Sequence, residues 1–331
     1  MKNILVVGLG SMGQRRIRLL RKHFPDVVIA GVDSREDRRD RARSEWGIEV
    51  FGDLDAGFAG FSPDGVVVST SPRSHGEIVC RCLSQGLHTF SEIDLMDLMY
   101  PSITSLSESG DLVAFLSSTF LYRDEIRWIL ANREKVGKKG FYSYHVGQYL
   151  PDWHPWESHR DFFVDDVDTN GIRELLCVEL PWLMRCFGKV VEFKVEWNTV
   201  SDLGLDYPDV YHCLFRHEGG FSGALTVDLV SRKPCRELSI SGERSTIRWD
   251  GVRDSLRAIS PEGTEMPFVG ERDEVQSGYA VFISELPYLK ELEAFFKAVE
   301  GDRSLVEFSY RDNLEVLALA DGLESVWRKG R

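Results

Sequence analysis

Residues 4–13 read ILVVGLGSMG, an apolar run that leads directly into three glycines spaced G-x-G-x-x-G. The run predicts a buried strand over residues 4–7, and the residues that follow predict a helix from about Ser11 to His23. Glycine-rich turns are common, but one that joins a strand to a helix is the setting that a dinucleotide phosphate requires. The helix then points its free N–H groups and the positive end of its dipole at the phosphates.

The three glycines of this motif have separate roles. Gly8 permits the tight turn, Gly10 lets the backbone approach a pyrophosphate, and Gly13 lets helix and strand pack closely. We therefore expect a dinucleotide to contact this turn, at Gly8, Gly10, Ser11, Met12 and Gly13.

The second predicted strand ends at Asp33, 20 residues after Gly13. An acid at this spacing accepts hydrogen bonds from the adenosine ribose and repels a 2′-phosphate, which favours NAD. Ser34 and Arg35 follow directly, and Arg35 could instead hold that phosphate, so NADP stays an alternative. The sequence thus predicts NAD, with its adenosine ribose beside Asp33, Ser34 and Arg35.

The first 120 residues alternate short apolar runs with longer amphipathic ones. Uninterrupted β-branched runs such as residues 66–68 suit strands that are buried on both faces. This alternation predicts a doubly wound parallel sheet, and hence a Rossmann domain over residues 1–121. Further strands are expected over residues 27–33, 66–69, 89–91 and 112–116, with helices over residues 36–46, 73–85 and 100–109.

The pattern changes after about residue 121. Residues 190–259 alternate apolar and polar positions between turn signals, which is typical of an antiparallel sheet with one covered face. We therefore expect an α/β protein whose second domain, residues 122–331, is of the α+β class. Helices are expected around residues 124–133, 171–187, 285–299 and 312–327, with an extended stretch over residues 140–149.

Composition and charge exclude several classes of protein. The 331 residues are 43% hydrophobic and 28% charged, which is ordinary for a globular protein and excludes disordered and fibrous chains. The net charge of −13 repels phosphate backbones and anionic lipids, so neither nucleic acid nor membrane is expected as a partner. The six cysteines form no C-x-x-C pair, so we expect a cytoplasmic protein without a metal site.

Two further stretches carry a family resemblance: residues 64–75 read DGVVVSTSPRSH, and residues 86–92 read GLHTFSE. With the glycine motif, they resemble the Gfo/Idh/MocA oxidoreductase family, whose members join a Rossmann domain to a domain with a large, open, mainly antiparallel sheet. Most members act on sugars, cyclitols or their nucleotide-linked forms. The resemblance also implies a homo-oligomer that pairs through the C-terminal sheet.

The resemblance assigns roles near the cofactor to five residues. It places Thr70, Ser71, Pro72 and His75 near the nicotinamide half, and Glu92 beside its ribose. His75 could instead be a helix residue whose hydrogen bonds are satisfied locally.

The chain departs from the family at two positions. The family usually has Glu-Lys-Pro, whose lysine assists proton transfer, but this chain reads Glu92-Ile93-Asp94. Ile93 cannot donate or accept a proton. On the helix over residues 171–187, Val178 stands where the family carries a histidine, so the usual general acid is absent as well.

Hydride transfer at a sugar carbon still needs a group that moves a proton at the attached oxygen. Histidine side chains ordinarily titrate near neutrality, which makes His154 a candidate, although it could simply be a loop histidine packed between Trp153 and Trp156. Arg173 could bind a substrate carboxylate or form a buried ion pair. Glu174 lies on an apolar helix, where a raised pKa would let it act as an acid.

These features predict an NAD(P)-dependent oxidoreductase with an atypical acid/base set, acting on a sugar or amino-sugar derivative. Residues 146–156 resemble a branch of the family associated with acylated amino sugars and nonulosonic acids. Two alternatives stay open. One is a catalytically inactive, dinucleotide-binding regulator or scaffold of the same fold, and the other is a reductase that needs no protein lysine as its acid.

Overall fold

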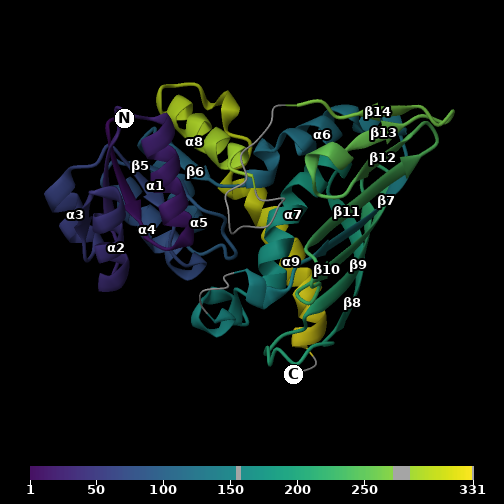
Figure 1. The fold of residues 1–331 in the computed structure, drawn as a ribbon, viewed down its shortest axis with the longest axis horizontal. Coiled ribbons are helices and arrows are strands. Elements are labelled where there is room, and N and C mark those ends of the chain that lie inside the picture. Colours follow the sequence, from purple (N-terminus) through teal and green to yellow (C-terminus); the bar gives the residue numbers. More distant parts are fainter. Residues whose placement is uncertain (154–157, 271–283, 330–331) are drawn as a thin grey trace. The chain divides into compact units, whose positions relative to one another are not determined.

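The computed structural model describes residues 1–153, 158–270 and 284–329, whose helices and strands are drawn in Figure 1. Within these residues no helix is long and apolar enough to cross a membrane. His154, one of the predicted site residues, lies outside the described residues.

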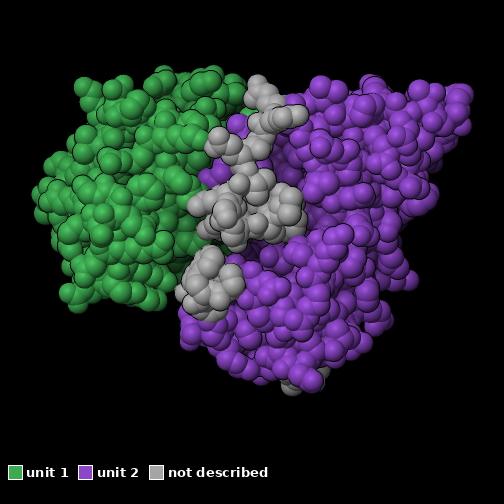
Figure 2. Space-filling view, viewed as in Figure 1, with its two compact units in different colours: residues 1–118, 288–314 green, residues 119–287, 315–331 purple. Residues whose placement is uncertain are grey.

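The chain forms two compact units, which Figure 2 draws in different colours. The first unit joins residues 1–118 to residues 288–314, and the rest of the described chain forms the second. The first unit is thus discontinuous, whereas the predicted division assigns all residues after 121 to the second domain. A buried ion pair gives the physical reason, because Arg16 near the N-terminus lies 2.8 Å from Glu291 of the later segment.

The first unit is built on a six-stranded sheet in the order β3-β2-β1-β4-β5-β6, and all of its pairings are parallel. This order is that of the doubly wound Rossmann fold, as predicted. Residues 4–6 and 66–68 of its central strands are fully buried, in agreement with their apolar sequence. The strands are β1 (Asn3–Val7), β2 (Val28–Val32), β3 (Glu49–Phe51), β4 (Gly65–Val68), β5 (His88–Ser91) and β6 (Ala114–Leu116).

The helices of the first unit come from both of its segments. The sequence pattern misses β3 and α3, since β3 has three residues and α3 contains two glycines that weaken its helical pattern. Asp53 nevertheless starts α3, because its side chain accepts a hydrogen bond from the backbone N–H of Ala56. The helices are α1 (Ser11–His23), α2 (Glu36–Trp46), α3 (Leu54–Phe61), α4 (Pro72–Ser84), α5 (Tyr100–Ser109), most of α8 (Leu286–Val299), the 3₁₀ helix η6 (Arg303–Leu305) and the start of α9 (Tyr310–Arg328).

The second unit is built on an eight-stranded sheet in the order β14-β13-β12-β11-β7-β10-β9-β8. All of its pairings are antiparallel except that of β7 with β10, which run parallel. The expected large, mainly antiparallel sheet is therefore confirmed. The strands are β7 (Gly140–Gly147), β8 (Val190–Asn198), β9 (Val210–His217), β10 (Phe221–Asp228), β11 (Cys235–Gly242), β12 (Thr246–Trp249), β13 (Arg257–Ile259) and β14 (Glu265–Pro267).

One face of this sheet is covered by helices, and no described helix covers the other, which we call the outer face. Along β7, Tyr142 and Tyr144 are buried, whereas Phe141 and His145 point to the outer face and are at least partly exposed. The helices α6 and α7 contact the strands from the covered side. The helices of this unit are α6 (Asp124–Val136), α7 (Gly171–Phe187), the rest of α9, and the 3₁₀ helices η1 (Thr119–Tyr122), η2 (Leu150–Asp152), η3 (His159–Asp161), η4 (Phe163–Asp165) and η5 (Arg253–Ser255).

Candidate functional site

The glycine turn joins β1 to α1. At two of its glycines, neighbouring backbone atoms leave no room for a side chain. Gly8 has φ +92°, and a Cβ there would lie 2.5 Å from the carbonyl oxygen of Ser69. A Cβ on Gly13 would clash with the carbonyl of Gly8. At Gly10 the nearest atom is instead the guanidinium end of Arg38, 3.3 Å from a built Cβ. The turn can therefore admit a pyrophosphate at Gly10, where only a flexible side chain must move.

The first turn of α1 provides backbone donors at the same place. Ser11 and Met12 are its first two residues, and the capping residue Gly10 has no side chain that could satisfy their N–H groups. Met12 also accepts a hydrogen bond at its sulfur from Arg15, 3.3 Å away. A diphosphate at this helix start would meet oriented N–H groups and the positive end of the dipole.

Asp33 follows β2 directly and is almost fully buried. Its Oδ2 accepts a hydrogen bond of 2.8 Å from the backbone N–H of Leu9, within the glycine turn. Its Oδ1 accepts one of 2.9 Å from the N–H of Arg35. An ionised carboxylate has about four lone-pair sites, so Asp33 can fix the turn and still accept bonds from ribose hydroxyls.

Arg35, the residue that could favour NADP, is exposed and forms an ion pair with Asp37. Its guanidinium lies 2.7 Å and 3.0 Å from the two carboxylate oxygens of Asp37. This contact lowers the pKa of Asp37, which keeps the pair ionised. The carbonyl of Ser34 accepts a bond from Arg39 rather than turning into the site. A 2′-phosphate would have to compete with Asp37 for Arg35, so the local geometry favours NAD.

The loop between β4 and α4 carries Thr70, Ser71 and Pro72. Pro72 occupies the first turn of α4, where a proline costs no hydrogen bond. The hydroxyl of Ser74 donates to the hydroxyl oxygen of Thr70 at 2.9 Å. The hydroxyl of Ser71, the capping residue, makes no capping bond. The predicted contacts of these three residues with the nicotinamide half stay a prediction.

His75 is buried, and both of its ring nitrogens have partners. Nε2 lies 2.9 Å from the carbonyl oxygen of Thr70 and so donates to it, and Nδ1 lies 3.0 Å from Oδ1 of Asp94. Burial lowers the pKa of His75, but the hydrogen bond to Asp94 outweighs it and the net pKa is raised. Burial also raises the pKa of Asp94. This geometry agrees with the alternative that the hydrogen bonds of His75 are satisfied locally.

Glu92 is held by Arg16, a residue that the sequence reasoning missed. The fully buried guanidinium of Arg16 bonds both carboxylate oxygens of Glu92, at 2.7 Å and 2.9 Å. It also bonds Oε2 of Glu291 at 2.8 Å. The signal was present in the sequence, because Arg16 lies one turn before Leu20 on the buried face of α1. A charged residue on such a face needs buried partners.

In the second unit, Arg173 lies near the start of α7 and is paired with two acids of α9. Its guanidinium lies 2.7 Å from Asp321 and 3.1 Å from the buried Glu324. Its backbone N–H donates to the side chain of Asn170, which caps the helix. Of the two readings that the sequence left open, the buried ion pair is the one this geometry fits.

Glu174, the next residue, lacks such partners. Its Oε2 is buried and has no hydrogen-bond partner in the described part of the chain. Burial raises the pKa of Glu174 to about 7. A carboxyl group with this pKa exists in both forms near neutral pH, so it can donate or accept a proton. Val178, one turn further along α7, brings no ionisable group to the same surface.

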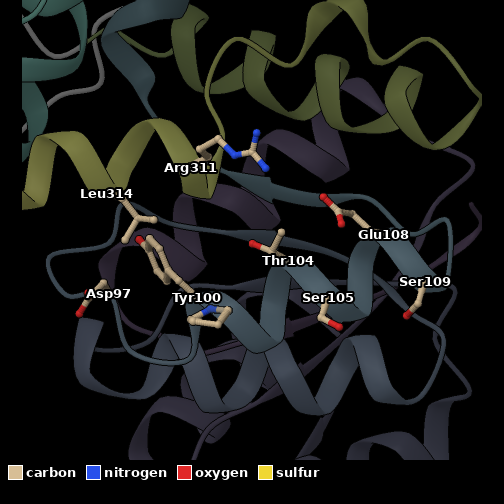
Figure 3. Close-up of a pocket in the computed structure, with 9 residues that line it drawn as sticks. Asp97, Tyr100, Thr104, Ser105, Glu108, Ser109, Arg311 and Leu314 are labelled. Atoms are coloured by element: carbon tan, nitrogen blue, oxygen red, sulfur yellow. The ribbon is translucent and has the colours of Figure 1, made fainter.

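A separate open pocket of about 720 Å³ lies in the first unit beside α5 (Figure 3). Thr104, Ser105 and Glu108 of α5 form one wall, and Arg311 of α9 faces them. None of the predicted site residues lines this pocket. Its lining residues are Asp97, Tyr100, Pro101, Thr104, Ser105, Glu108, Ser109, Arg311 and Leu314.

Residues 2–114 match the family model GFO_IDH_MocA, described as the oxidoreductase family with an NAD-binding Rossmann fold. The match covers the Rossmann segment of the first unit and does not extend into the second unit. This match confirms the predicted family and NAD as the cofactor, and with them the expectation of an NAD-dependent oxidoreductase. No curated protein matches the chain with significant sequence similarity.

Solved structures share the fold of the whole chain, both units included. An Agrobacterium radiobacter oxidoreductase in complex with NAD+, L-tartaric acid and magnesium has a TM-score of 0.79 at 19% identity, covering 100% of this chain and 97% of its own. The Bordetella pertussis dehydrogenase WlbA, with NADH and UDP-GlcNAcA, has a TM-score of 0.79 at 16% identity, covering 100% and 98%. A Corynebacterium glutamicum myo-inositol dehydrogenase has a TM-score of 0.77 at 17% identity, also covering 100% and 98%. At these identities the likeness establishes the fold alone.

Proposed function

We propose that this protein is an NAD-dependent dehydrogenase of a sugar or amino-sugar derivative, and that Glu174 moves the proton at the reacting hydroxyl. The observation that carries the proposal is the carboxyl group of Glu174, which has a buried oxygen without a partner among the described residues and a pKa raised to about 7 by burial. A proton-transfer group works best when its pKa lies near the working pH. Glu174 meets this requirement without the family lysine.

The chemistry at the substrate follows from that assignment. NAD, when bound at the glycine turn, supplies the hydride acceptor. In the oxidation direction, the Glu174 carboxylate accepts the hydroxyl proton as the carbonyl forms, and in reduction the protonated carboxyl returns it. Arg173, bound to Asp321 and Glu324, holds the start of α7 and so acts as a positioning residue. His154 remains a second proton-transfer residue in this proposal.

The proposed substrate class draws on two supports. The second unit shares its fold with proteins described as a myo-inositol dehydrogenase and as a complex with UDP-GlcNAcA. Residues 146–156 resemble the amino-sugar branch of the family. A polyhydroxylated ring, free or nucleotide-linked, fits both supports.

The test follows nicotinamide absorbance while the protein is offered a panel of free and nucleotide-linked sugars, amino sugars and cyclitols. We expect NADH to appear with at least one of the panel, and the Glu174→Gln variant to lose that activity. Turnover that is unchanged in the variant would remove Glu174 from the mechanism. If NADH binds but no member of the panel turns over, the substrate class is wrong.

The absence of the lysine at position 93 favours a second candidate, a dinucleotide-binding protein that has lost hydride transfer. Ile93 lies between two buried carboxylates that are already paired, Glu92 with Arg16 and Asp94 with His75. Such a site would be rebuilt around an apolar residue. Restoring the lysine therefore separates a rebuilt enzyme from a decayed one.

We expect Ile93→Lys to lower NADH affinity or stability and to give no gain in sugar oxidation. The new ammonium would compete with Arg16 and His75 for their carboxylates, and an unpaired buried charge costs about 3–5 kcal/mol. Thermal unfolding and NADH titration measure the two losses. A variant that folds normally and gains sugar oxidation would instead support the second candidate, a native protein that has lost hydride transfer.

Cofactor preference is the second expected result. The protein should bind NADH more tightly than NADPH by about 1–3 kcal/mol, because Asp33 bonds the ribose hydroxyls and repels a 2′-phosphate. Asp33→Ala should narrow that difference in affinity. It should also weaken the binding of both cofactors, because Asp33 accepts a hydrogen bond from the backbone N–H of Leu9 in the glycine turn. Fluorescence titration of both cofactors measures the gap, with Arg35→Ala as the control. Tighter NADPH binding that Arg35→Ala abolishes would contradict the assignment.

A further inference from the structure

Asp94, which stands where the family has the proline of Glu-Lys-Pro, is buried in the first unit and bonded to His75. The proton transfer proposed for Glu174 uses neither residue. Oδ1 of Asp94 lies 3.0 Å from Nδ1 of His75, and Nε2 of His75 lies 2.9 Å from the carbonyl oxygen of Thr70. A carboxyl group, an imidazole ring and a backbone carbonyl are therefore linked in series.

The carbonyl of Thr70 belongs to the loop between β4 and α4. The order of the sheet reverses between β1 and β4, because β2 and β3 lie beyond β1 whereas β5 and β6 lie beyond β4. In a doubly wound sheet a dinucleotide binds at this switch point, outside the carboxyl ends of the strands. The glycine turn after β1 and the loop after β4 are the two segments that flank it.

This loop also contacts the glycine turn directly. A Cβ on Gly8 would lie 2.5 Å from the carbonyl oxygen of Ser69 and 2.8 Å from the backbone nitrogen of Thr70. Backbone therefore packs against backbone, and no side chain lies between the two segments to absorb a movement. A displacement of the loop at Thr70 consequently displaces one wall of the turn.

The two ends of the series decide where its protons lie. A carbonyl oxygen only accepts hydrogen bonds, so Nε2 of His75 carries a hydrogen and donates it to Thr70. A lone pair of Nδ1 would repel a carboxylate oxygen at 3.0 Å, so one further proton lies between His75 and Asp94. That proton belongs either to an imidazolium beside a carboxylate or to a carboxylic acid beside a neutral ring. In both cases the buried pair carries no net charge.

Asp94 is held in turn by two other residues of the first unit. The hydroxyl of Tyr100 bonds its carboxylate. Asn313 donates to that hydroxyl at 2.7 Å and to the backbone carbonyl of Asp94 at 3.3 Å. Asp94, Tyr100 and Asn313 are all buried. The carboxyl group is therefore a fixed support that orients the ring of His75.

We propose that Asp94 is a positioning residue: it acts through His75 to hold the carbonyl of Thr70, and so fixes the loop after β4 in the conformation that binds NAD. The loop contacts the dinucleotide, whereas Asp94 and His75 lie behind it. This role concerns NAD binding alone, so it is independent of the substrate and of Glu174.

The shared proton makes this support dependent on pH. Burial lowers the pKa of His75, but the hydrogen bond to Asp94 outweighs it and the net pKa is raised above the ordinary 6.5. Burial also raises the pKa of Asp94. The pair therefore keeps its proton to a higher pH than a free histidine does, and its support is lost as pH rises through the raised pKa. The carboxylate then faces a lone pair of the ring.

The other ionisable groups around the pair come from four elements. Glu92, after β5, is ion-paired with Arg16 of α1 at 2.7 Å. Burial raises the pKa of the uncharged groups, which are Tyr100 on α5, Tyr310 on α9, and Cys80 and Cys82 on α4. These hydroxyls and thiols ordinarily titrate at 9.0 or above, so with raised pKa values they stay largely uncharged up to that pH.

Fluorescence titration of the full-length protein with NADH at pH 7 tests the role of Asp94, with thermal unfolding to show that each variant is folded. Asp94→Leu fills a similar volume without a hydrogen bond, and we expect it to bind NADH about tenfold more weakly, the usual effect of losing one charge-assisted bond. Asp94→Asn should stay within about threefold of the wild type, because its amide can donate to Nδ1 while Nε2 still donates to Thr70.

A double-mutant cycle shows whether Asp94 acts through His75. His75→Leu should weaken NADH binding as much as Asp94→Leu does, and the double variant should lose no more than either single one. His88→Ala is the matched control: His88 lies at the amino end of β5 and accepts a bond of 3.0 Å from the N–H of Val113. Its loss should lower the unfolding temperature and leave NADH affinity unchanged.

The pH profile of NADH affinity gives a readout that a merely structural role would not change. The wild type should lose affinity as pH rises from 7 to 9, whereas Asp94→Asn, which has no shared proton, should not. This comparison needs no destabilised variant. Unchanged affinity in folded Asp94→Leu, or additive losses in the double variant, would overturn the proposal. Equal pH profiles in the wild type and Asp94→Asn would contradict the shared proton and with it the role of the pair.

Discussion

Glu174→Gln is expected to slow hydride transfer by about 10²–10⁴-fold, the usual contribution of a general acid or base. The amide keeps the size of the side chain but cannot exchange a proton. NADH affinity should stay nearly unchanged, because the proposal assigns Glu174 to the substrate hydroxyl and not to the dinucleotide. Steady-state turnover with NADH titration measures both quantities.

The same substitution should stabilise the fold above neutral pH. The pKa of Glu174 is raised by burial from its ordinary 4.5 to about 7, so the folded state holds a proton that the unfolded state has lost. A raised carboxyl pKa means that stability declines as pH rises from 4.5 to 7, where the folded protein must bury an unpartnered charge. The full difference corresponds to about 3 kcal/mol. Glu174→Gln cannot ionise and so does not lose this stability. Urea unfolding at pH 8 should therefore give the variant a free energy of unfolding higher than that of the wild type by up to about 3 kcal/mol. At pH 4 the two free energies should be similar.

Glu179 provides the matched control on the same helix. It is fully buried, but Tyr144, Trp182 and Arg236 all donate hydrogen bonds to it, at 2.7–2.8 Å. Glu179→Gln should therefore destabilise the protein at pH 8, because it leaves the charge of Arg236 uncompensated. If Glu174→Gln raises stability at pH 8 and Glu179→Gln lowers it, Glu174 does not stabilise the fold, which supports a catalytic role. If both variants lose stability, Glu174 has a structural role.

The turn around Gly8 could be predicted because its signal is local. A strand, a tight turn and a helix start follow one another within residues 3–23, and each requires residue types that the sequence displays. Neighbours in sequence are then neighbours in space. The same holds for the strands at residues 4–7 and 66–68, whose burial follows from their unbroken apolar runs.

The state of a charged side chain depends on partners that are remote in sequence. The partners of Arg173 lie about 150 residues away on α9, and nothing near Arg173 distinguishes an ion pair from a substrate contact. The hydrogen bond between His145 and Asp228 was missed for the same reason, since 83 residues separate the two. Register between β7 and β10 brings these residues together, and the sequence pattern predicts strands without their register.

Arg16→Met is expected to destabilise the protein by about 3–5 kcal/mol, the usual cost of removing one partner of a buried ion pair. Arg16 is fully buried and lies between the carboxylates of Glu92 and Glu291. Without it, the two carboxylates remain buried with like, mutually repelling charges. The hydroxyl of Ser117 bonds Glu291 at 2.7 Å, but a neutral donor compensates a buried charge less well than a guanidinium does. Urea unfolding at pH 7 measures the loss.

The pH dependence identifies the cause of that loss. Burial already raises the pKa of Glu291, and removal of Arg16 should raise it further. Carboxyl groups with raised pKa values cost stability as pH rises, so Arg16→Met should be least stable above pH 7 and recover towards pH 5. Adding Glu92→Gln and Glu291→Gln to the variant should restore much of the stability lost at pH 7, because no buried charge then remains.

Arg21→Met is the control on the same helix: Arg21 is exposed, and its loss should change stability by no more than about 0.5 kcal/mol. A loss in Arg16→Met that does not depend on pH would mean that packing against Phe90, rather than charge, is what Arg16 contributes.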